Sequence, residues 1–164
     1  MVEQEHREEG VAQIQEGLEM SRSARAGLWR PYFLCLLADA CIRTGRFDNG
    51  LSALTEALVI SDELGIGFSK PEIHRLQGEL LLRKNDSNVA QAKRCFERAI
   101  ELAQSRNAKS LQLRATTSLA RLLAKHGKRD EAHAMLAEIY NWFTEGFDTA
   151  DLKVAKILLD ELSI

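Results

Sequence analysis

The sequence predicts an all-α protein, a right-handed solenoid of antiparallel helix pairs with about eight helices. Three observations favour this fold. Small residues recur at a spacing near forty, since Ala38 to Gly78 is 40 residues and Gly78 to Ala120 is 42, and the two prolines, Pro31 and Pro71, are again 40 apart. No stretch alternates polar and apolar residues as a half-buried strand does. Helix pairs of this length must stack, because one pair alone cannot bury its apolar face.

The elements follow in chain order. Apolar residues at helical spacing over residues 5–24 predict the second helix of a pair whose first helix is missing. The next helix begins near Pro31, where a missing N–H costs little, and ends at Gly45, the residue type that readily adopts the left-handed conformation of a helix stop. The remaining helices are expected over residues 49–64, 71–84, 89–105, 108–126, 128–142 and 150–162.

These helices form one domain of 164 residues. It divides into a half repeat (residues 1–27), three repeats (28–68, 69–107 and 108–146) and a C-terminal capping helix (147–164), for which Asp148 or Thr149 is available as N-cap. The unpaired first helix indicates a piece of something larger. It also offers an open N-terminal end through which a homodimer could form.

The positions of the small residues favour one class of two-helix repeat over others. They stand in the first helix of each pair (Ala38, Gly78 and Ala120) and early in the second (Gly50, Ala92 and Ala132). A large residue follows four positions after the second set, as at Phe96 and Leu136. This is the tetratricopeptide (TPR) pattern, although repeats of the HEAT or armadillo kind would also suit the period.

Composition excludes several classes of function. The 22 basic and 24 acidic residues nearly cancel, which argues against nucleic acid or an anionic membrane as a direct partner. Cys35, Cys41 and Cys95 have no metal-site or redox spacing and are expected to be buried thiols in a reducing compartment. There is no signal segment and no apolar run long enough to cross a bilayer. We therefore expect a soluble, cytoplasmic protein.

Catalytic motifs are absent from the sequence. It has no phosphate-binding glycine loop, no nucleophile elbow and no HExxH zinc motif, and its four histidines are scattered without metal-ligand spacing. We therefore expect neither enzymatic activity nor a cofactor or metal.

The candidate binding site is the face formed by the first helix of each pair, which lines the concave surface in TPR arrays. Alignment of the three copies gives the candidate concave-face residues Tyr32, Asp39, Arg43, Arg75, Glu79, Arg83, Arg114, Arg121 and Lys125. With Glu72 included, six bases and three acids give this face a net charge of +3 in a chain of net charge −2. Such a basic lane suits an acidic or C-terminal peptide, because arginine forks match carboxylates. The alternative is a solvated face of intrahelical ion pairs.

Four segments together resemble a known family. They are residues 27–33 (GLWRPYF), 72–82 (EIHRLQGELLL), 113–122 and, most distinctively, the tail 142–153 (WFTEGFDTADLK). The chain resembles the C-terminal TPR region of large bacterial regulators, in which a class III adenylate or guanylate cyclase domain, or a DNA-binding domain, precedes a STAND-type AAA ATPase. Leu111 and Ala150 depart from the tryptophan and proline often found in the family at these places.

The resemblance covers nearly the whole chain and implies a sensor or scaffold without an active site. The implied role is a non-catalytic interaction module that binds a partner protein or restrains its own ATPase domain. An ATPase-type transcriptional regulator is the other parent the resemblance allows, and a receptor for a small anionic ligand is the rival from a different class. In the tail, Trp142, Phe143 and Phe147 are expected to be core aromatics that seat the last helix.

Overall fold

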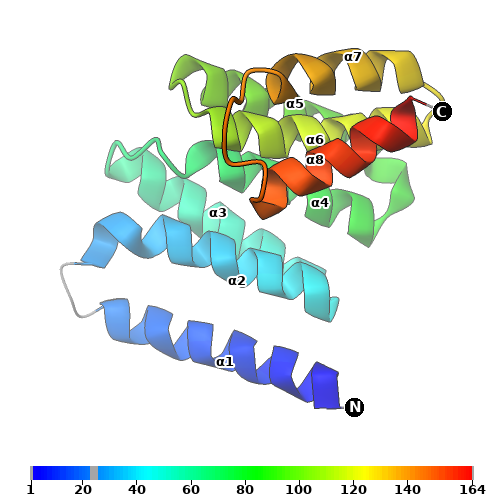
Figure 1. Ribbon diagram of the computed structural model, residues 1–164. Helices are drawn as coiled ribbons and strands as arrows, with labels where there is room; N and C mark the ends of the chain where they lie inside the picture. Colours follow the sequence, from blue (N-terminus) through cyan, green and yellow to red (C-terminus); the bar gives the residue numbers. More distant parts are fainter. Residues whose placement is uncertain (1, 23–25, 164) are drawn as a thin grey trace.

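The computed structural model describes residues 2–22 and 26–163, and within these residues all regular secondary structure is helical (Figure 1). The described residues contain eight α-helices and two short 3-10 helices, joined by turns. They are α1 (Val2–Arg22), η1 (Ala26–Trp29), α2 (Arg30–Thr44), α3 (Phe47–Glu63), α4 (Lys70–Lys84), η2 (Asp86–Asn88), α5 (Val89–Ser105), α6 (Lys109–Lys125), α7 (Arg129–Tyr140) and α8 (Ala150–Leu162). The predicted all-α fold is therefore confirmed.

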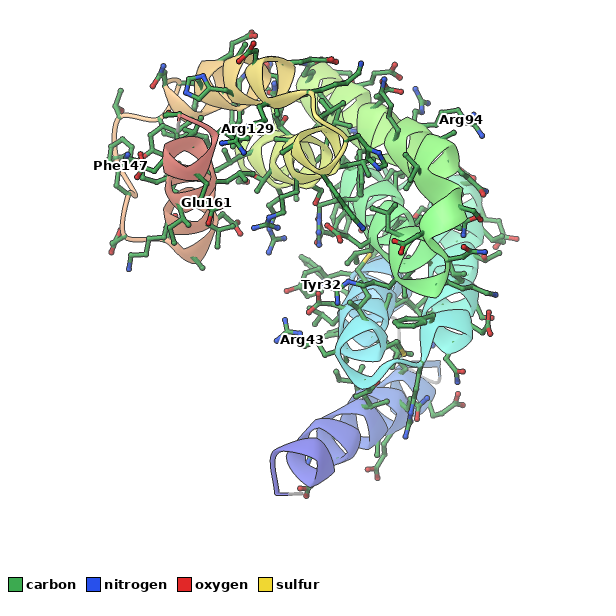
Figure 2. The ribbon with its side chains drawn as sticks, turned by 90° about the vertical axis from the view of Figure 1, so that its right-hand side faces the viewer. Tyr32, Arg43, Arg94, Arg129, Phe147 and Glu161 are labelled. Atoms are coloured by element: carbon green, nitrogen blue, oxygen red, sulfur yellow. The ribbon has the colours of Figure 1, made fainter. Side chains whose placement is uncertain are left out.

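The helices pack in chain order as antiparallel neighbours, and each forms its largest interface with the helix before or after it (Figure 1). A second set of contacts gives the array its shape. Helix α2 touches α4, α4 touches α6 and α6 touches α8, whereas no such contacts join α1, α3, α5 and α7 within the described residues. The even-numbered helices are therefore closer together and form an inner layer, and the array bends around it into the arc seen in Figure 2.

Local signals place the helix ends where the sequence predicts them. Gly45 has φ 72°, a left-handed conformation that suits glycine, and its N–H donates to the carbonyl of Cys41 to close α2. Pro31 and Pro71 lie in the first turns of α2 and α4. Thr149 occupies the N-cap position of α8 with extended backbone, but its side chain makes no capping hydrogen bond.

The small residues of the repeat are buried where two helices cross. A Cβ on Gly78 of α4 would lie 2.4 Å from the ring of Phe96 on α5, so only glycine lets this ring seat fully between the two helices. Phe96 is 1% exposed, and Ala38, Ala92, Ala120 and Ala132 are fully buried. The sequence prediction that small residues allow close helix approach is confirmed at these positions.

The apolar core forms two clusters along the array. One is built on α1 to α4 and includes Leu54 and Leu80, and the other is built on α5 to α8 and includes Leu136 and Leu159. Helix α8 supplies five buried residues to the second cluster and so covers α6 and α7. None of the described helices combines the length and the apolar character that a membrane span needs.

The tail aromatics are the main correction to the expected core. Trp142 is 57% exposed and Phe147 45% exposed, and only Phe143 packs partly against the buried cluster. Helix α7 ends at Tyr140, two residues before the expected end, and the chain continues in a turn in which Asn141 and Trp142 are exposed. The aliphatic side chains of α8, with Leu152 and Leu159 among them, fasten this helix instead of the aromatic side chains.

Candidate binding groove on the concave face

The predicted concave-face residues all lie on the inner helices and line two adjoining crevices. Figure 2 shows Tyr32 and Arg43 directed toward the hollow of the arc and Arg94 directed away from it, on the convex side. The crevice between α2 and α4 (the α2–α4 crevice) is lined by Tyr32, Asp39, Arg43, Arg75 and Arg114. The crevice between α4 and α6 (the α4–α6 crevice) is lined by Glu79, Arg83, Arg121 and Lys125.

A network of ion pairs centred on Glu72 lies on the α4 and α6 side of the α2–α4 crevice, which has a volume of about 350 Å³. Arg75 donates to both carboxylate oxygens of Glu72, at 2.9 and 2.8 Å, and its other terminal nitrogen lies 3.7 Å from Glu79. Arg114 on α6 donates to Glu72 at 3.3 Å and lies 3.0 Å from Asp151 on α8. Arg114 therefore links three inner helices, because it pairs with Glu72 on α4 and with Asp151 on α8.

The electrostatics of this network follow from its burial. Burial alone raises the pKa of Glu72, but the hydrogen bond and charge of Arg75 and the charge of Arg114 outweigh it, so the pKa lies below its usual range. Burial alone lowers the pKa of Arg75, but its bond to Glu72 and the charges around it raise the pKa above its usual value. Both groups are held in their charged forms by each other.

Cys35 also lines the α2–α4 crevice but offers no reactive thiolate. It is 4% exposed. Burial, with the charge of Glu72 adding to it, raises the pKa of its thiol to about 12. At neutral pH this side chain is a small apolar residue of the wall.

The α4–α6 crevice has a different charge arrangement, in a volume of about 500 Å³. Lys125 donates to Asp86 at 3.3 Å, and the hydroxyl of Ser118 donates to Glu79 at 2.7 Å. Within residues 2–22 and 26–163, Arg83 and Arg121 have no ion pair or side-chain hydrogen bond. Both are exposed, and both line the same crevice. Two unpaired guanidinium groups thus face one cavity.

The basic lane expected from aligned positions is therefore only partly present. Asp86 and Asp151, which the alignment did not include, pair with Lys125 and Arg114, and Asp39 pairs with Arg43 at 2.5 Å. Of the six bases counted from the sequence, four have an acidic partner. The cations left for a ligand are concentrated in the α4–α6 crevice.

Sequence reasoning missed Asp86, Ser118 and Asp151, and it did not identify Glu72 as the centre of the network. One signal could have found them, because the pairs between helices join residues about one repeat apart. Glu72 and Arg114 are separated by 42 residues, Glu79 and Ser118 by 39, and Asp86 and Lys125 by 39. Complementary polar residues at this separation predict contacts between successive inner helices.

The part of the chain that the structure describes contains no group of three or more His, Cys, Asp or Glu side chains suited to a metal ion. The two crevices instead supply guanidinium donors, a paired carboxylate network and apolar walls. Such surfaces can hold an anionic or peptide ligand by charge and shape.

The comparisons with known proteins give one distant similarity. No protein-family model matches the chain. A protein of Rhizobium meliloti (strain 1021), described as uncharacterized, is 30% identical over 115 residues. The match spans 69% of this chain but 11% of that protein's length. This chain is therefore similar to a small segment of a much longer protein, without a family assignment.

Proposed function

We propose that this chain is a non-catalytic interaction module whose concave face binds an acidic segment of a protein. The observation that carries the proposal is the pair of exposed, unpaired arginines, Arg83 and Arg121, lining the α4–α6 crevice. Two like charges at one cavity repel each other, and an anion between them would relieve that cost. A carboxylate is well suited, because guanidinium groups bind it in a bidentate fork.

The scaffold supports the binding of a protein segment in particular. The inner helices form a curved layer, and the two crevices follow each other along α4 and α6, so a chain laid along these helices could reach both. The Glu72 network joins α4, α6 and α8, which favours a preformed site and so lowers the cost of ordering it on binding.

The biological setting belongs to the same proposal. The resemblance of the tail and repeat segments suggests the TPR region of a bacterial cyclase-ATPase regulator, or of an ATPase-type transcriptional regulator. The acidic segment would then belong to a partner protein or to the ATPase domain of the same polypeptide. The match to a short segment of a long protein is compatible with such a multidomain setting.

A receptor for a small anion is the second candidate, and the cavity of about 500 Å³ beside Arg83 and Arg121 favours it. The two functions make different predictions. An anion receptor binds inorganic phosphate or citrate in thermal-shift and calorimetric titrations at micromolar concentration. An interaction module responds weakly to these ions and binds an acidic peptide more tightly, because a peptide makes additional contacts.

The experiment is a fluorescence-anisotropy titration with a labelled ten-residue peptide rich in Glu and Asp, against a control peptide with Gln and Asn in their place. We expect saturable binding of the acidic peptide that weakens steeply with salt. Arg121→Glu should weaken it at least about tenfold, which corresponds to about 1.4 kcal/mol.

The matched control is Arg94→Glu. It makes the same change in net charge on the convex side, where Arg94 is exposed on α5. Its affinity for the acidic peptide should stay within about twofold of wild type, because exposed charges far from the site are screened by salt. Equal losses in the two variants would show that only the total charge matters and would remove the proposed site.

A further inference from the structure

The two crevices differ in what they offer a ligand, and this difference suggests the pattern of the segment that binds. The α2–α4 crevice has an exposed apolar wall on which Tyr32 is 47%, Leu36 40% and Phe68 44% exposed. Leu111 adds to this wall from α6. Trp29 lies 5.7 Å from Phe68, ring centre to ring centre, and extends the apolar surface to the edge of the groove.

The charges of the α2–α4 crevice are used within the protein. Each of its cations, Arg43, Arg75 and Arg114, has an acidic partner. A ligand gains little there from an ionic group, because the protein partner must first be displaced. A bulky apolar side chain gains more, since it covers exposed Tyr32, Leu36 and Phe68 and is itself removed from water. The α4–α6 crevice, with Arg83 and Arg121, has the opposite preference.

The separation of the crevices follows from the positions of their residues along the shared helices. On α4, Glu72 and Arg75 line one crevice and Glu79 and Arg83 the other. Their midpoints are about seven to eight residues apart, or about 11 Å at about 1.5 Å rise per residue. On α6, the midpoints of the residues that line the two crevices are about 14 Å apart along the helix. The crevices can also be displaced from each other across the helices by at most one helix spacing, about 8–10 Å. The distance between them is therefore about 11–17 Å.

The width of the crevices selects an extended ligand over a helical one. Both lie between inner helices that touch each other, whose axes are about 8–10 Å apart in packed pairs. A ligand helix with its side chains is about 10–12 Å across and would rest above such crevices. An extended chain advances about 3.3 Å per residue, so about three to five residue positions span the distance between the two crevices.

We propose that the groove binds an extended peptide with a bulky apolar residue at one anchor and an acidic residue three to five positions away. The apolar side chain occupies the α2–α4 crevice against Tyr32, Leu36 and Phe68. The carboxylate lies between Arg83 and Arg121 in the α4–α6 crevice. This inference rests on the proposed function and specifies the ligand of the same face.

The test is a series of labelled peptides in which one Leu and one Glu-Glu pair are separated by one to ten positions of Gly and Ser, in both orders. Affinity is measured by anisotropy with the full chain. We expect a maximum at three to five positions in one order, at least about tenfold above separations of one and ten, because a linker is most effective when it matches the span.

Variants test the two anchors separately. Phe68→Ala should flatten the dependence on spacing while weak binding through Glu-Glu remains. Trp142→Ala, which removes an exposed aromatic from the α7–α8 connection, is the matched control and should leave the maximum unchanged. Arg121→Glu should weaken the whole series.

The outcomes separate the two proposals. Binding that depends on the Glu-Glu pair but not on spacing, or a Phe68→Ala variant that keeps the maximum, overturns the two-anchor pattern and leaves the acidic groove standing. A maximum near eight to ten positions would indicate a helical ligand and also overturns it. Failure of every acidic peptide to bind overturns the proposed function as well.

Discussion

The two crevices of the concave face each lie between successive inner helices but use their charges differently. In the α2–α4 crevice, Arg75 and Arg114 converge on Glu72 and contribute to the packing of the inner helices. In the α4–α6 crevice, Arg83 and Arg121 remain without acidic partners among the described residues. The difference shows that the net charge of a surface does not predict whether it can bind a charged ligand. What matters is which charges already have a partner one repeat away.

The first prediction breaks the α2–α4 network at its centre. Glu72→Gln keeps the shape of the side chain but leaves Arg75 facing a neutral amide at a site where the two side chains are 15–17% exposed. We expect a loss of about 2–3 kcal/mol in the free energy of unfolding, measured by urea denaturation, because hydrogen bonds to charged groups are strong and a largely buried cation loses its main partner.

Asp86→Asn is the matched control for that substitution. It also replaces an acid that pairs with a base on the next inner helix, but Asp86 and Lys125 are both well exposed. Its effect should be within about 0.5 kcal/mol, as is usual for surface ion pairs. A Glu72→Gln variant as stable as Asp86→Asn would show that the two crevices do not differ in the way described.

The second prediction concerns the pH dependence of stability that Glu72 of the α2–α4 crevice contributes. The pKa of Glu72 is lowered in the folded protein, so its contribution to stability is complete above the pKa of an unfolded glutamate and is lost as pH falls toward the lowered value. Wild type should therefore lose more stability than Glu72→Gln between about pH 5 and pH 3. Thermal unfolding at each pH measures this, and parallel curves would contradict the assignment.

The third prediction concerns stability in the other crevice and is the smallest effect. Replacement of Arg83 and Arg121 together by Gln should change the free energy of unfolding by no more than about 0.5 kcal/mol, because exposed side chains without partners contribute little. The change is measured by urea denaturation. A large loss of stability would show that these arginines have a structural role.

Much of the fold could be predicted from the sequence, because its signals are local. Gly45, Pro31 and Pro71 mark helix ends through backbone preferences that depend on few neighbours. The period of the small residues gave the pairing, and the steric contact of Gly78 with Phe96 explains why that period is visible.

For the site, the sequence predicted which residues line the crevices but not how these residues pair. The nine candidate residues do line the two crevices, since alignment of repeats places equivalent side chains on equivalent faces. Their pairing depends on the register between helices, and the bond of Arg114 to Asp151 also depends on where α8 packs. The prediction that the tail aromatics lie in the core was wrong for a similar reason. Apolar character alone does not tell which side of a connection faces the core, and Trp142 faces solvent.

The central claim is that the charged residues of the α2–α4 crevice contribute to the stability of the array, whereas those of the α4–α6 crevice bind the ligand. The most direct test measures both properties, urea stability and affinity for the acidic peptide, in Arg114→Gln and Arg121→Gln. Arg114→Gln should lose up to about 1 kcal/mol of stability, since its pairs with Glu72 and Asp151 are partly exposed, and keep its affinity within about twofold. Arg121→Gln should keep its stability and lose affinity severalfold. Equal losses of affinity in the two variants, or a reversed pattern, would contradict the account.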